Sequence, residues 1–171
     1  MKSYQSFKKA AKKSSEPIKA LDCALYFLGH RKRSEKEIIT KLKQKDYEEA
    51  EIEETLIKLR ELGFIDDADF AQSLINDRRN FNKVGKRMLV QELRAKGING
   101  EIIDEMVSLN ATDESEFDNA LILAEKKAAA LAGQDSQAIK NKLYQFLLRK
   151  GYSSHIIARV LKHLAMGGIE E

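Results

Sequence analysis

The sequence predicts an all-α fold in which three tandem three-helix repeats, each similar to a helix-turn-helix unit, form an elongated, curved array. The 171 residues include one Pro and no Trp, and 33% are charged, which is typical of a helix-rich soluble chain. Between Ile18 and Leu164, apolar residues recur at spacings of three and four, as amphipathic helices require. The chain also repeats itself, so small units are expected to stack on their neighbours.

Three matching turns define the repeats. Their sequences are Lys45-Asp46-Tyr47, Lys96-Gly97-Ile98 and Lys150-Gly151-Tyr152, at separations of 51 and 54 residues. In all three, a leucine precedes the turn by three positions and an isoleucine follows its last residue by five, without gaps. We predict repeats over residues 17–64, 65–111 and 112–166. A basic segment, 1–16, is expected to be mobile, and a tail, 167–171, follows the last repeat.

The first repeat carries one helix signal and one atypical turn. Ser34 followed by Glu37 forms a capping box, which marks a helix start. Asp46 stands where the other two turns have glycine, and we expect it to adopt the left-handed conformation that glycine favours after a helix. Tyr47 should then fold back and pack, as its counterparts in the other turns do. This turn is therefore predicted to be structural.

The stretch ELGFIDDADF, residues 61–70, connects the first repeat to the second. Its carboxylates, Asp66, Asp67 and Asp69, could clamp a divalent metal, but at the opening of a helix they point in different directions. We interpret the stretch as a joint: Gly63 ends one helix, the apolar pair after it packs, and Asp66 caps the next helix.

Helix starts are also marked in the second and third repeats. Asn99, Asp135 and Ser153 stand just before apolar-periodic stretches. Asp113 with Glu116 has the spacing of a second capping box. The chain should therefore hold about nine short helices in all.

Charge alternates in sign along the chain although the net charge is only +3. Residues 78–100 carry seven basic side chains and one acidic one, whereas residues 101–125 carry eight acidic side chains and no basic one. A soluble protein with uneven faces accounts for this, but so do spaced basic patches that meet a repeating, negatively charged partner. The candidate binding residues are Arg31, Arg33, Arg78, Arg79, Lys83, Lys86, Arg87, Arg94, Lys96, Arg149 and Lys150.

Little in the sequence points to catalysis. His155 and His163 lie two helical turns apart with Arg159 between them, and His30 is remote in sequence. Cys23 is the only cysteine, so it excludes an intrachain disulfide and indicates a reducing compartment. No phosphate-binding loop, dinucleotide fingerprint or membrane-spanning run occurs. We predict a cytoplasmic protein that is not an enzyme and has no metal or cofactor.

The chain resembles the RecX family of bacterial regulatory proteins over roughly residues 18 to 164. The strongest match is LGFIDDADFA, Leu62 to Ala71, followed by Arg78, Gly85 and Arg87 ahead of QELRAKGI, and by RKRSEKEI at Arg31 to Ile38. The residues of this structural signature are Gly63, Asp66, Asp67, Phe70, Gly85, Gly97 and Gly151. The chain departs from the pattern at Asp46 and in the third repeat, which is poor in signature residues.

The resemblance implies three helical modules that lie in the groove of the RecA–DNA filament. Such proteins inhibit RecA ATP hydrolysis, strand exchange and filament growth in recombinational repair and the SOS response, and some bind single- or double-stranded DNA. A working monomer is implied. The chain is either a short member of the family or part of a longer protein. The alternative function is a free-standing DNA-binding protein that uses its helix-turn-helix-like repeats.

Overall fold

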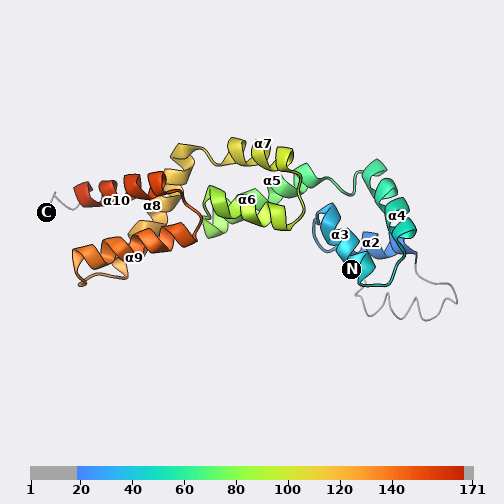
Figure 1. Cartoon of the computed structure of the whole chain (residues 1–171), viewed down its shortest axis with the longest axis horizontal. Helices are drawn as coiled ribbons and strands as arrows, with labels where there is room; N and C mark the ends of the chain where they lie inside the picture. The colour runs from blue at the N-terminus through green and yellow to red at the C-terminus, as the bar shows by residue number, and fades with distance from the viewer. Residues whose placement is uncertain (1–18, 168–171) are drawn as a thin grey trace. The chain divides into compact units, whose positions relative to one another are not determined.

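A computed structural model of the protein describes residues 19–167, and all regular structure in that range is helical (Figure 1). The expected mobile segment, 1–16, lies outside these residues, as does the tail from residue 168 onward. The elements are α2 (Ala20–Leu28), α3 (Glu35–Lys43), α4 (Glu49–Glu61), α5 (Asp67–Asp77), η1 (Arg78–Asn82), α6 (Lys86–Ala95), α7 (Gly100–Asn110), α8 (Asp113–Ala129), α9 (Ser136–Arg149) and α10 (Ser154–Gly167). The all-α class and the three tandem three-helix repeats are confirmed.

The chain divides into two compact units, Met1–Asp67 and Ala68–Glu171. The division falls inside the stretch that the sequence identified as a joint. The first unit contains the module α2–α4. The second unit contains the module that begins with α5 and the module α8–α10.

All three predicted turns adopt the same helix-ending geometry. Asp46, Gly97 and Gly151 have φ angles of 61°, 81° and 92°, so the left-handed conformation is confirmed, including at the aspartate. The amide of the next residue then donates back to a carbonyl five residues earlier: Tyr47 to Leu42, Ile98 to Leu93 and Tyr152 to Leu147, at 3.4, 3.1 and 3.2 Å. This is the Schellman motif, which satisfies carbonyls that a helix end would leave unpaired.

The first unit packs its apolar residues between three helices. Ile38 and Leu42 of α3 meet Ile52, Leu56 and Leu59 of α4 in one buried cluster. The hydroxyl of Ser34 accepts from the amide of Glu37, which confirms its role as the cap of α3.

The end of α4 differs in one residue from expectation. Gly63 has a φ of 68° and ends the helix, as predicted, because the amide of Phe64 donates to the carbonyl of Leu59 at 2.9 Å. Ile65 is buried in the core, but Phe64 is 52% exposed. The prediction that both residues pack was therefore wrong for Phe64 and correct for Ile65.

The second unit contains two apolar clusters, one for each module. Leu89, Leu93, Ile103 and Val107 are among the buried residues of the first cluster. The second cluster includes Leu143, Leu147, Ile157 and Val160, with the fully buried ring of Tyr152.

The caps of these modules were mostly predicted. Asn99 and Asp135 accept amides of their own helices, at 2.9 Å in both cases, and the hydroxyl of Ser153 accepts from the amide of Ile156. The predicted capping box of Asp113 and Glu116 is wrong. Thr112 caps α8 instead, by accepting from the amide of Ser115.

Candidate functional site

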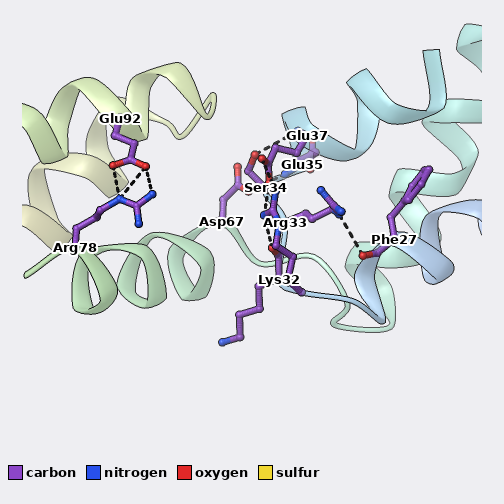
Figure 2. Close-up of polar contacts among 10 residues, drawn as sticks. Phe27, Lys32, Arg33, Ser34, Glu35, Glu37, Asp67, Arg78 and Glu92 are labelled. Carbon is purple, nitrogen blue, oxygen red and sulfur yellow. Dashed lines mark hydrogen bonds and ion pairs between the residues drawn. The ribbon is translucent and has the colours of Figure 1, made fainter. Parts of the chain in front are cut away.

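One acidic side chain of the signature, at the end of the first unit, bonds back to that unit. Asp67 accepts a hydrogen bond from the backbone amide of Glu35 at 3.0 Å, so it occupies an otherwise unpaired donor at the start of α3 (Figure 2). Arg60 holds the carboxylate of Glu35 through two hydrogen bonds of 2.7 and 2.8 Å. Burial raises the pKa of Asp67, although the amide of Glu35 opposes the shift.

Asp66, Asp67 and Asp69 do not come together as ligands. Among residues 19–167, no three His, Cys, Asp or Glu side chains are grouped so that they could hold a metal ion. Asp69 is exposed and Asp67 faces α3. The carboxylate of Asp67 is therefore engaged at the start of α3.

The two arginines predicted near the first interhelical turn make contacts within the first unit. Arg31 donates two hydrogen bonds to Glu37, at 2.9 and 3.0 Å. Arg33 donates to the carbonyl of Phe27 at 3.2 Å, and its guanidinium lies 5.7 Å from the centre of that ring (Figure 2). Arg31 therefore connects the turn after α2 to α3, and Arg33 connects the same turn to α2.

Arg78 is also engaged within its own module. It makes three hydrogen bonds to the carboxylate of Glu92, between 2.6 and 3.1 Å, which join η1 to α6 (Figure 2). These bonds raise the pKa of Arg78. Its charge is largely compensated by Glu92, so its first role is to position η1.

Arg79 is not available at the surface, because only 6% of it is exposed. Its guanidinium pairs with Glu116 and donates to the hydroxyl of Ser115 at 2.9 Å. The other oxygen of Glu116 accepts the backbone amide of Lys86 at 3.0 Å. This buried pair joins η1, the start of α6 and α8, and it explains why Glu116 does not serve as a cap. We therefore no longer consider Arg79 a candidate binding residue.

Two glycines bring the second and third modules into backbone contact. The amide of Gly85 donates to the carbonyl of Lys150 at 2.8 Å, and the amide of Arg87 donates to the carbonyl of Gly151 at 3.1 Å. A Cβ atom on Gly85 would lie 2.6 Å from backbone atoms of Gly151 and Tyr152. We call this approach of Gly85 to Gly151 the glycine contact. Both glycines belong to the predicted signature, but the sequence did not indicate that they meet.

Lys83 is held at the same place by two hydrogen bonds. It adopts a left-handed conformation with φ 46°, its ammonium donates to Asn119 at 3.2 Å, and its carbonyl accepts from the Tyr152 hydroxyl at 2.6 Å. Burial raises the pKa of Tyr152, which therefore stays a hydroxyl donor. Lys83 keeps an uncompensated charge because Asn119 is neutral.

The glycine contact brings basic residues from two modules together. Lys86 and Arg87 begin α6, whereas Arg149 ends α9 and Lys150 follows it, next to the contact. We call these four residues the basic junction. Their side chains make no hydrogen bond or ion pair with any residue between 19 and 167, and all but the half-buried Lys150 are exposed.

Two of these cations stand where a helix disfavours positive charge. Lys86 and Arg87 are the first two residues of α6, whose first turn contains no acidic residue. The positive end of the helix dipole lies there, so these side chains do not stabilise their helix. Arg94, Lys96, Arg149 and Lys150 lie at helix C-termini, where the dipole favours them. The dipole therefore accounts for these four cations but not for Lys86 and Arg87.

The cysteine and two of the histidines make contacts within their own units. Cys23 packs against the core of the first unit, and burial raises the pKa of its thiol. His30 bonds to the backbone of Tyr26, and His163 packs edge-on against Phe117. In the described part of the chain, no helix is both long and apolar enough to span a bilayer.

Comparison with known families matches all three modules. Residues 20–59, 66–107 and 113–161 match the models of the first, second and third three-helix domains of RecX. The regulatory protein RecX of Chlorobium phaeobacteroides is 42% identical over 85% of this chain and 93% of its own length. The regulatory protein RecX of Clostridioides difficile is 37% identical over 86% of this chain and 68% of its own.

A solved structure agrees with these matches. The crystal structure of RecX from Lactobacillus salivarius has a TM-score of 0.79 and 31% identity to this chain. The similarity covers 86% of this chain and 96% of the solved one.

Proposed function

The chain belongs to the RecX family, and on that basis we propose that it is a regulator that binds the RecA–DNA filament through its basic junction. In this proposal it inhibits RecA ATP hydrolysis, strand exchange and filament growth in recombinational repair and the SOS response. It acts as a cytoplasmic monomer without a cofactor and does not itself catalyse a reaction. The contacted surface is either RecA or the phosphates of the DNA that RecA covers.

The observation that carries the proposal is the placement of Lys86 and Arg87. Both are exposed, neither has a partner among residues 19–167, and the helix dipole disfavours both. Charge kept at such a position is expected to serve an external, negatively charged group. Arg149 and Lys150 extend the same charge from the neighbouring module.

The test is RecA ATPase activity on single-stranded DNA with this protein titrated in. Lys86→Glu with Arg87→Glu should weaken inhibition at least about tenfold, since several charge-assisted contacts reverse sign. Lys126→Glu with Lys140→Glu changes the net charge equally at exposed sites outside the junction and should inhibit almost as the wild type does. Equal potency of the two variants would remove the junction from the proposal. If the wild-type protein neither inhibits RecA nor sediments with its filaments, the proposed function is wrong.

Free-standing DNA binding is the second candidate, and the composition of α10 favours it. α10 is the second helix of a helix-turn-helix pair and has no acidic residue. Arg159 stands seven residues after the last turn residue of its repeat, where the other two repeats have Glu54 and Glu105. If this function holds, the wild-type protein should bind naked duplex DNA and have no effect on RecA. Arg159→Glu with Lys162→Glu should then abolish the binding to duplex DNA.

A further inference from the structure

The five-residue π-helix η1, Arg78–Asn82, presents an aromatic ring to solvent. Phe81 is 81% exposed, more than any other large apolar residue that the structure describes. η1 ends at Lys83, whose left-handed φ is uncommon for a residue with a side chain. Single π-helical turns occur often at functional sites, because they distort a helix at a conformational cost.

The exposure of Phe81 does not come from a loose loop, because η1 is held from three sides. Arg78 is bonded to Glu92, and the adjacent Arg79 is buried against Glu116. The amide of Val84 donates to the carbonyl of Arg78 at 3.3 Å, and Val84 itself is buried. The turn thus holds the ring outward on a fixed backbone.

The exposed residues next to Phe81 in the sequence are polar or basic. Asn80 and Asn82 flank it and are exposed. Lys83, Lys86 and Arg87 follow within six residues, and no acidic residue occurs from position 78 to position 91. An aromatic ring beside uncompensated cations suits a base that stacks on the ring while its phosphates meet the cations. A partner with an apolar pocket would instead be expected to meet further apolar side chains around the ring.

We propose that Phe81 stacks on a base of single-stranded nucleic acid and that Lys83, Lys86 and Arg87 contact the flanking phosphates. This inference rests on the proposed function, since it names the DNA strand as one partner of the basic junction. It adds a stacking contact that charge alone would not provide. Because every base has an aromatic face, the contact would not depend on sequence.

The test is equilibrium binding of a fluorescein-labelled thymidine oligonucleotide to the purified protein, without RecA. Phe81→Leu keeps an apolar side chain but removes the aromatic face, and we expect it to weaken binding roughly 5- to 150-fold, the loss typical of one stacked base. Phe81→Trp keeps the face and should bind as tightly as the wild type or more tightly. An abasic strand of equal length should bind wild type and Phe81→Leu equally.

Other outcomes would overturn the inference. If Phe81→Leu binds the oligonucleotide as the wild type does, the ring does not stack. If that variant also inhibits RecA normally whereas Phe81→Ala does not, the ring enters an apolar pocket on a protein. The proposed function fails separately, when the wild-type protein neither inhibits RecA nor sediments with its filaments. Urea unfolding should be unchanged in all Phe81 variants, because the ring lies outside the core.

Discussion

Replacing Gly85 by alanine should separate the second and third modules. The φ of Gly85 is −80° and its ψ is 165°, a conformation that alanine adopts readily, so the backbone itself adds no strain. The new Cβ would lie 2.6 Å from three backbone atoms of Gly151 and Tyr152, whereas ordinary contact begins at 3.4 Å. Since backbone atoms cannot rotate away as a side chain can, the two segments must move apart by most of that difference.

The cost follows from what the movement breaks. The hydrogen bonds of 2.8 Å from Gly85 to Lys150 and 3.1 Å from Arg87 to Gly151 would stretch beyond the usual bonding range. Each contributes about 1 kcal/mol, and overpacking adds roughly 1–3 kcal/mol. We expect Gly85→Ala to lower the free energy of unfolding of the second unit by about 3–5 kcal/mol, the sum of these contributions.

The assay is urea unfolding followed by circular dichroism at 222 nm. Gly100→Ala is the matched control: Gly100 is the first residue of α7, and a Cβ there would have no neighbour within 4 Å. That variant should be as stable as the wild type or up to about 1 kcal/mol more stable, since alanine favours helix. If Gly85→Ala unfolds within about 0.5 kcal/mol of the wild type, the inferred steric clash is wrong.

Three further changes probe the other contacts by the same unfolding assay. Arg79→Met leaves the buried charge of Glu116 without its ion-pair partner and should lower the free energy of unfolding by about 3–5 kcal/mol. Adding Glu116→Leu should restore much of that stability. If Arg79→Met lowers stability by less than about 1 kcal/mol, the pair is not desolvated. Asp46→Gly should stabilise the first unit by about 0.5–1 kcal/mol, because glycine adopts a φ of 61° without the steric cost that an aspartate meets there. A loss of stability would show that Asp46 is not strained. Asp67→Ala should cost about 1 kcal/mol through the lost bond to Glu35, whereas Asp67→Asn keeps an acceptor and should not. Because the folded state raises the pKa of Asp67, its side chain favours folding most below about pH 3.8, and that contribution is lost as the pH rises through the folded pKa. The stability of the wild type relative to Asp67→Asn should therefore fall with rising pH, and a rise would contradict the shift.

Local features of the fold were predictable from the sequence because their causes lie within a few residues. The turn at Asp46 could be inferred by aligning it with Gly97 and Gly151, since a left-handed residue after a helix is selected by local geometry. The caps at Ser34 and Asn99 follow from hydrogen bonds within one helical turn.

The candidate site was harder to predict, because its contacts join residues far apart in the chain. Asp113 and Glu116 have the spacing of a capping box, but the partner of Glu116 is Arg79, 37 residues away. Arg78 and Arg79 were predicted to be binding residues because the sequence shows their charge. It does not show that each pairs with a glutamate of its own unit. Charge patterns could therefore identify the basic region but could not separate exposed from compensated cations.

The contact between Tyr152 and Lys83 has a consequence for synthesis on the ribosome. The core of the first unit is complete once Ile65 has emerged, so that module can fold while the rest is being translated. The hydroxyl of Tyr152 reaches a carbonyl 69 residues earlier in the chain. Until Tyr152 has emerged, η1 and the start of α6 lack that bond and the glycine contact. We therefore expect the basic junction to form only after Tyr152 has been translated, 69 residues later than Lys83.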